Sequence, residues 1–241
     1  MKFKNKLIQS KFQKRYKRFF ADVESKGKIL ISHCANSGSM LTLKEPGSTV
    51  WVSKIPEKSE RKLRYDWHVI EDKQKNDEWV GINTSWPNKL VEEALNNKVI
   101  SELTAYPTLK REVKYGLQNS RIDFLLTGEN LPDCYLEIKS VTLKNGEAVQ
   151  FPDAVTARGT KHLEELIHMS ESGHKSVVLY VVQRQDCAHF SVADHIDPTY
   201  AATAKLAKEK GVLFLCYTCD ITKDSITINT PLPLKETGPA T

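Results

Sequence analysis

The pattern of apolar residues changes near residue 83, and this change most limits what the chain can fold into. Before it, short apolar runs alternate with turn sequences such as Ser25-Lys-Gly-Lys28, which is typical of β-strands joined by tight turns. The strands expected here are 18–23, 29–33, 40–43, 49–53, 65–70 and 79–83. Because no long helix interrupts them, they indicate a small β-barrel or sandwich, and an OB-like barrel fits the length.

After residue 83 the chain alternates between helix and strand patterns. Helices are expected at 87–103, where apolar residues recur at helical spacing, and at 157–170 and 198–210. Strands are expected at 112–115, 121–126, 134–141, 176–183 and 212–219. This order requires crossovers and therefore a mixed, partly parallel sheet. The expected fold class is α/β (α+β), with an OB-like β-barrel over 1–82 followed by a mixed-sheet α/β domain over 83–241.

The two expected domains differ in charge. Residues 1–82 hold 18 Lys/Arg and 10 Asp/Glu, a net charge of +8, whereas residues 83–241 hold 17 and 20, a net charge of −3. The first 21 residues contain eight basic residues and no acid, interleaved with aromatic rings such as Phe12, Tyr16, Phe19 and Phe20. Phosphate backbones favour such a surface and bases stack on aromatic rings, which makes this segment a candidate nucleic-acid-binding surface. A solvated charge run beside core aromatics explains the pattern equally well.

Nothing in the sequence indicates a membrane or secreted protein. No apolar stretch approaches the ~20 residues of a membrane span, and no apolar run follows the basic N-terminus. The five cysteines are odd in number, which argues against a disulfide framework. We therefore expect a cytoplasmic protein with no membrane partner. Its oligomeric state is not encoded in any pattern that we recognise.

Two neighbouring segments, 120–126 and 134–140, are the most informative part of the sequence. If they form an antiparallel hairpin centred on Asn130, one face is wholly apolar, with the pairs Ile122/Ile138, Phe124/Leu136 and Leu126/Cys134. The other face then carries the pairs Asp123/Glu137 and Arg121/Lys139. Like charges directly opposite each other destabilise a sheet, so two adjacent carboxylates need an explanation.

A divalent cation resolves the conflict between the two acids. Mg²⁺ (or Mn²⁺) is usually held by one or two carboxylates, which predicts Asp123 and Glu137 as metal ligands. Lys139 points to the same face, where an ammonium can orient or deprotonate the attacking water and neutralise phosphate charge. This spacing has the shape of the PD-(D/E)XK nuclease motif, although Arg121-Ile122 stand where Pro often precedes the first acid. The alternative is a surface hairpin whose basic residues screen the acids.

Two further acids could belong to the same site. Arg158, His162 and Glu165 share one polar helix face, and nuclease-like sites often add a helix residue such as Glu165 or His162. Glu112, on the preceding strand, is a further candidate catalytic acid. A solvated helix face and a surface strand charge are the alternatives. The chain has no P-loop, no G-x-G-x-x-G and no H-E-x-x-H motif.

The sequence resembles the sugar fermentation stimulation protein A (SfsA) family over nearly its whole length. The resemblance rests on ordered blocks such as Cys134-Tyr-Leu-Glu-Ile-Lys-Ser-Val-Thr142, and the other blocks are 15–23, 33–40, 80–84, 112–116, 120–124, 151–155 and 158–163. Ala35 stands where the family usually shows Pro. The resemblance implies an OB-type domain joined to a nuclease-like domain, DNA binding, and a link to regulation of sugar, notably maltose, utilisation.

Three functional hypotheses follow. The first is a DNA-binding protein with a Mg-dependent phosphodiesterase site, acting as an endonuclease or exonuclease. The second is a transcriptional regulator that keeps the nuclease scaffold without chemistry, although no helix pair shows a helix-turn-helix signature. The third is a carbohydrate-binding OB-type module, which the positive charge of residues 1–82 argues against. The expected nucleic-acid-binding residues are Arg15, Lys17, Arg18, Arg61, Lys62, Arg64, Tyr65, Trp67, Arg121 and Arg158.

Overall fold

Five strands of the N-terminal half close into an OB-like barrel. The computed structural model describes residues 1–72 and 78–235. The strands run in the order β3-β2-β1-β4-β5-β6, and a parallel pairing of β3 with β5 closes the barrel. The five barrel strands are β1 (Leu7–Tyr16), β2 (Phe20–Ser25), β3 (Lys28–Cys34), β4 (Thr49–Lys54) and β5 (Tyr65–Asp72), and β6 (Glu78–Gly81) extends the sheet beside β5. The expected barrel is therefore confirmed.

Two details of the barrel differ from the sequence prediction. Strand β1 was missed, because its basic residues alternate with buried positions such as Leu7, Ser10 and Phe12 and so hide the apolar period. The expected strand at 40–43 is wrong, since Met40 and Thr42 have positive φ values of 49° and 70° and the segment is a turn. Met40 and Leu43 are nevertheless buried in the barrel core.

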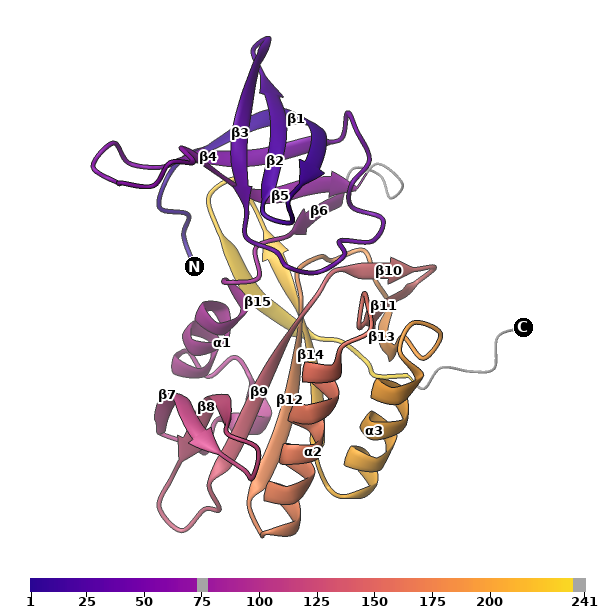
Figure 1. Ribbon diagram of the computed structural model, residues 1–241. Helices are drawn as coiled ribbons and strands as arrows, with labels where there is room; N and C mark the ends of the chain where they lie inside the picture. The colour runs from indigo at the N-terminus through magenta and orange to yellow at the C-terminus, as the bar shows by residue number, and fades with distance from the viewer. Residues whose placement is uncertain (73–77, 236–241) are drawn as a thin grey trace.

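The second half of the chain forms a mixed sheet with helices on both faces (Figure 1). Its strand order is β15-β14-β12-β9-β8-β7, in which β9, β12 and β14 are parallel. Its strands are β7 (Thr108–Tyr115), β8 (Ser120–Thr127), β9 (Cys134–Val141), β12 (Lys175–Val182), β14 (Leu213–Ile221) and β15 (Ile226–Pro231). A small second sheet holds β10 (Leu143–Asn145), β11 (Ala148–Phe151) and β13 (His189–Val192), none of which was expected.

The helices divide the apolar residues of this domain into two cores. Helix α1 (Pro87–Asn96) covers one face of the sheet, and it ends earlier than expected, with a separate 3₁₀ turn at Ser101–Leu103. Helices α2 (Ala157–Glu171) and α3 (Pro198–Glu209) cover the other face. The Thr156 hydroxyl accepts a hydrogen bond of 3.1 Å from Gly159 N and so caps α2.

A buried ion-pair cluster joins the barrel to the mixed-sheet domain. Arg184, which is fully buried, donates hydrogen bonds of 2.9 Å to Asp72 at the end of β5 and of 2.6 Å to Asp186. The peptide N–H of Gly81 also donates to the carbonyl of Gln183 at 2.9 Å. These contacts fix where the barrel sits above the sheet.

A carboxylate from α2 holds the turn between β7 and β8. The Glu165 side chain, 2% exposed, accepts hydrogen bonds from the amides of Leu117 and Gln118 at 2.8 and 2.6 Å. Gly116 precedes them with a φ of +66°, and a β-carbon there would overlap Glu165 Oε2. The turn can therefore approach the helix only because residue 116 has no side chain.

Replacing Arg184 with leucine removes the buried cation that joins Asp72 to Asp186, although Asp186 keeps Lys144 at 2.7 Å. We expect the free energy of unfolding to fall by about 3–5 kcal/mol, because one partner of a buried ion pair is removed. Arg61→Leu is the control, because it removes an exposed pair with Asp66 and should cost at most about 1 kcal/mol. Denaturant unfolding measures both. Equal losses of unfolding free energy in the two variants would contradict the stabilising role of the Arg184 ion pairs.

Gly116→Ala tests the contact between the turn and α2. Alanine costs about 1–2 kcal/mol at any positive φ, and at this position it also displaces Glu165 from its two amides, for a total of about 3 kcal/mol or more. Gly27→Ala is a matched control, because Gly27 has a φ of +74° with nothing within 4 Å of the added carbon. Thermal unfolding of the two variants gives the comparison, and a similar loss in both would refute the contact.

Candidate functional site

Asp123 lies where strands β8 and β9 separate. The pairs Phe124/Leu136, Leu125/Tyr135 and Leu126/Cys134 confirm the predicted register, and the ladder ends there. The peptide N–H of Ile138 then donates to Asp123 Oδ2 at 2.8 Å. A side-chain oxygen thus occupies the position where the main chain of β8 would continue the ladder.

The predicted pairing of Ile122 with Ile138 is wrong. Ile138 packs in the core under α1, whereas Ile122 packs with Val141 in the core under α2. Phe124 belongs to the α1 core, so β8 changes the face that it presents between Ile122 and Phe124. The separation of the strands at Asp123 is the physical reason. Before Phe124, β8 no longer pairs with β9 but still pairs with β7, through Val113 and Ile122, so it can turn away from β9.

Helix α1 supplies the second partner of Asp123. The Asn88 side chain donates from Nδ2 to Asp123 Oδ1 at 2.8 Å. Both carboxylate oxygens are therefore oriented, one by the backbone of β9 and the other by α1. Sequence analysis missed Asn88, because only the packing of α1 across the sheet brings residues 88 and 123 together.

Glu137, on β9, is the most buried acid of the site, and its two oxygens are used unequally. Its side chain is 4% exposed, and Oε1 accepts a hydrogen bond of 2.8 Å from Lys139 Nζ and a close one from His162 Nδ1. Because an ionised carboxylate only accepts, the proton of the His162 ring sits on Nδ1. Oε2 is buried and has no hydrogen-bond partner among the described residues.

The two carboxylates have pKa values that move in opposite directions. Burial, followed by the charge of Glu137, raises the pKa of Asp123 to about 6, against the hydrogen bonds of Ile138 and Asn88. Burial alone would raise the pKa of Glu137 as well, but Lys139 and His162 outweigh it, so that pKa lies below its ordinary value. Glu137 therefore ionises at a lower pH than Asp123.

Tyr115 adds a buried phenol to this group. Its hydroxyl has no hydrogen-bond partner within the described part of the chain. Burial, followed by the charges of Glu137, Glu165 and Asp123, raises the pKa of Tyr115. The phenol therefore stays protonated and can donate a hydrogen bond to an incoming group. Its position at the end of β7 gave no functional signal in the sequence.

The donor set fits a divalent cation that also binds water and substrate. The unpartnered Oε2 of Glu137 is an orphaned buried acceptor, and Asp123 presents a second carboxylate nearby, as oxygen-seeking cations require. Over residues 1–72 and 78–235, no group of three or more His, Cys, Asp or Glu side chains gathers closely enough to hold a metal alone. A cation here would take the remaining ligands from water or phosphate.

The other predicted catalytic acids lie elsewhere. Glu165 faces the β7–β8 turn, where its carboxylate binds two amides, so the helix residue that reaches Glu137 is His162. Glu112 is exposed on β7, with a φ of 53°, and its carbonyl accepts a hydrogen bond from Arg121. The structure does not bring either side chain to Glu137, and their catalytic roles stay predictions.

Several predicted nucleic-acid-binding residues serve the fold. Trp67 is fully buried and stacks on Phe12, so the expectation that it stacks on a base is wrong. Arg15 donates to the carbonyls of Arg18, Asn36 and Gly38, and so braces a loop. Tyr65 packs against the barrel core, and Arg61 pairs with Asp66. Arg64 donates hydrogen bonds to the carbonyls of Ile55, Pro56 and Ser59.

The remaining basic residues are available at the surface. Lys17 and Arg18 form the β1–β2 turn, and Lys62 lies in the loop before β5; all three are exposed. Arg121 is exposed on β8. Arg158 is exposed on the first turn of α2, and its Nε donates to His162 Nε2 at 3.4 Å. Arg158 therefore connects the surface to the residue that contacts Glu137.

The comparisons with known proteins agree with this architecture. Residues 14–82 match the family model described as SfsA N-terminal OB domain, and residues 85–225 match the model described as sugar fermentation stimulation protein RE domain. Sugar fermentation stimulation protein homologs from Roseobacter denitrificans and from a Ruegeria species are 44% and 48% identical, covering 98% and 97% of this chain and 100% of theirs. No helix in the described residues is both long and apolar enough to span a membrane.

A solved structure resembles the whole chain. SfsA of Pyrococcus furiosus, solved in complex with Ca²⁺, superposes with a TM-score of 0.86 at 25% identity and covers 98% of both chains. The matched family models together cover most of this chain, and the relatives align over nearly all of it. The chain therefore belongs to the sugar fermentation stimulation protein family.

Proposed function

We propose that the protein binds DNA and hydrolyses its phosphodiester bonds with the help of a divalent cation, Mg²⁺ or Mn²⁺. The observation that carries the proposal is the buried, unpartnered Oε2 of Glu137 beside the raised-pKa carboxylate of Asp123. Two buried acids at one place are unfavourable unless a cation joins them. The Ca²⁺ complex of the Pyrococcus furiosus relative supports a site for a divalent ion in this fold.

Each residue of the site has a distinct task in this proposal. Asp123 and Glu137 hold the cation, and Asn88 and the Ile138 amide fix the orientation of Asp123. A bound cation supplies Lewis-acid stabilisation of phosphate charge and lowers the pKa of a bound water. His162 keeps its proton on Nδ1 toward Glu137 and so orients that carboxylate.

Lys139 serves the attacking water and the phosphate. Its side chain is 11% exposed, so its ammonium lies at the rim of the site while it contacts Glu137 Oε1. From this position its ammonium would neutralise the negative charge of the phosphodiester. Arg158 and Arg121 contribute further positive charge from the neighbouring surface, where they contact phosphates without reading sequence.

A non-catalytic regulator is the second candidate function. The ion pair between Lys139 and Glu137 and the hydrogen bond of His162 leave Glu137 Oε1 fully satisfied without a metal, which favours a scaffold that binds DNA only. In this role the protein regulates sugar utilisation genes, such as those for maltose, in the cytoplasm. The two candidates differ in whether the carboxylates bind a cation and whether DNA is cut.

Glu137→Gln tests the metal site in solution. Glutamine keeps the shape and the Oε1 contacts but loses the charge, so we expect affinity for Mn²⁺ to fall by roughly 100-fold or more. Calorimetric titration of Mn²⁺ into each protein measures the change. Glu209→Gln is the control, because it removes the same charge from an exposed site on α3 and should leave the affinity unchanged. Equal Mn²⁺ binding by wild type and Glu137→Gln would refute the assigned ligand.

Plasmid and single-stranded DNA with Mg²⁺ or Mn²⁺ test the chemistry. We expect cleavage that Asp123→Ala and Lys139→Ala each reduce by roughly 10²-fold or more, because they remove a metal ligand and the cation that faces the phosphate. Robust cleavage by Asp123→Ala would point to a contaminant. DNA binding without any cutting, indifferent to Lys139→Ala, would establish the non-catalytic regulator instead.

A further inference from the structure

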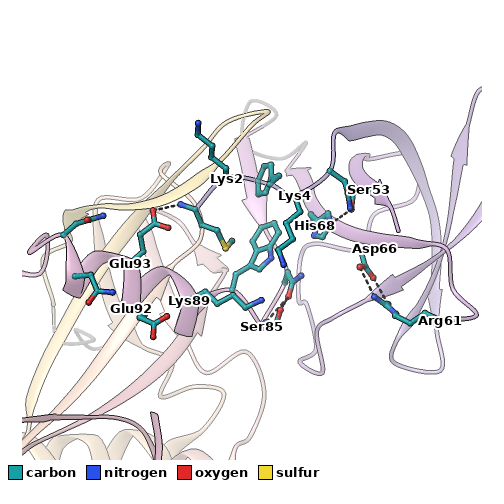
Figure 2. Close-up of a pocket in the computed structure, with 17 residues that line it drawn as sticks. Lys2, Lys4, Ser53, Arg61, Asp66, His68, Ser85, Lys89, Glu92 and Glu93 are labelled. Atoms are coloured by element: carbon teal, nitrogen blue, oxygen red, sulfur yellow. Dashed lines mark hydrogen bonds and ion pairs between the residues drawn. The ribbon is translucent and has the colours of Figure 1, made fainter. Parts of the chain in front are cut away.

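A cleft lies between the barrel and helix α1. It has a volume of about 900 Å³ and is lined by the N-terminal segment 1–5, by residues of β4 and β5, and by one face of α1. Figure 2 shows Lys4 from the N-terminal segment and Lys89 from α1 both extending into the gap, while Lys2 points outward at its rim. The volume falls in the range of sites that bind small ligands.

The acids of the cleft already have cationic partners, whereas three of its lysines have none. Asp66 pairs with Arg61, Glu93 with the N-terminal ammonium group at 2.7 Å, and Glu92 with Arg111. For Lys2, Lys4 and Lys89 no ion pair or side-chain hydrogen bond occurs within residues 1–72 and 78–235. Three uncompensated positive charges therefore surround one cavity, which calls for an anion of several charges.

Uncharged hydrogen-bonding groups complete the lining. The side-chain amides of Asn5, Asn96 and Asn97 have no partner among the described residues. His68 Nε2 lies 2.8 Å from Ser53 Oγ, and its buried Nδ1 has no hydrogen-bond partner in the same part of the structure. Burial lowers the pKa of His68 to about 4, so the ring is neutral. Asparagine amides are groups that pair with the edges of nucleobases, whereas both ring nitrogens of His68 are buried or bonded within the protein.

The cleft and the candidate catalytic site share helix α1. Lys89, which extends into the cleft, follows Asn88, which binds Asp123. Glu92 lines the cleft and is bound by Arg111, whose backbone pairs with Phe124 next to Asp123. The cleft and the carboxylate Asp123 are therefore neighbours at the N-terminal end of α1.

We propose that this cleft binds a single strand of nucleic acid, with phosphates on Lys4 and Lys89 and base edges on the asparagines, and guides it to Asp123. The proposal rests on the proposed function for the destination of the strand, but not for the binding itself. A cavity of this size accepts a few nucleotides of one strand, whereas a duplex would have to open before it could enter.

The test compares two double variants with equal loss of charge. Lys4→Gln/Lys89→Gln removes the cleft lysines, and Lys26→Gln/Lys28→Gln removes two exposed lysines from the β2–β3 turn. Binding of a fluorescently labelled dT12 strand is followed by anisotropy in EDTA, which prevents cleavage. We expect the cleft variant to bind roughly tenfold more weakly near 0.1 M salt, and its slope of log K against log salt to fall by about 1.4, at ~0.7 for each lost phosphate contact. The turn variant should match the wild type.

The other arms identify the ligand. Duplex DNA of the same length should lose less affinity than the single strand in the cleft variant. Inorganic phosphate and dTMP should compete weakly; saturable binding of either that fully displaces dT12 would show a small-anion site and overturn the proposal. Equal dT12 affinity in the two double variants would overturn it as well.

The outcomes for the cleft and for catalysis are separable. If strand binding depends on Lys4 and Lys89 but the protein cuts no DNA, the cleft proposal stands and the proposed hydrolysis fails. If the Lys4→Gln/Lys89→Gln variant cleaves single strands as well as the wild type, with an unchanged KM, the cleft proposal fails and the proposed hydrolysis stands. Supporting both proposals requires a raised KM at unchanged kcat in that variant.

Discussion

The hydrogen bond from the Ile138 amide to Asp123 Oδ2 is the interaction on which the site depends. It puts a carboxylate where the β8–β9 ladder would otherwise continue, so the strands part without leaving the amide of Ile138 unsatisfied. Past that point, Ile122 turns to the α2 core while Phe124 stays in the α1 core. The opening brings α1, through Asn88, and α2, through His162, to the same two acids.

The electrostatics of the opening explain why it suits a cation. Glu137 is held charged by Lys139 and His162, but both act on one oxygen, and the other faces no donor within the described chain. Asp123 loses water without gaining a cation of its own, so its carboxylate resists ionisation. A protein that needed only stability would not keep this arrangement, because an apolar pair of similar size avoids the desolvation cost of both acids.

Sequence reasoning succeeded where a local pattern decides the structure. The apolar alternation of 120–126 and 134–140 predicted the register near the turn correctly. The predicted pairing of Ile122 was wrong, because the twist of β8 beyond its last pair with β9 is set by the two cores and not by the strand itself. It predicted Asp123, Glu137 and Lys139 as one site, but it left the choice between Glu165 and His162 open, because both lie on the same helix face. That choice depends on where the β7–β8 turn lies, and the Glu165 carboxylate binds the backbone of this turn, next to Gly116. Asn88 and Lys89, which only the packing of α1 brings into place, left no signal in one sequence.

A crystal of the protein soaked in Mn²⁺ gives the most direct test of the central claim. We expect an anomalous peak bound by Asp123 and by Oε2 of Glu137, with Lys139 moved away from Oε1. The remaining ligands should be waters, at the distances that oxygen ligands take around a small divalent cation. A fully occupied Mn²⁺ elsewhere, with Lys139 and His162 still closed on Glu137, would contradict the account.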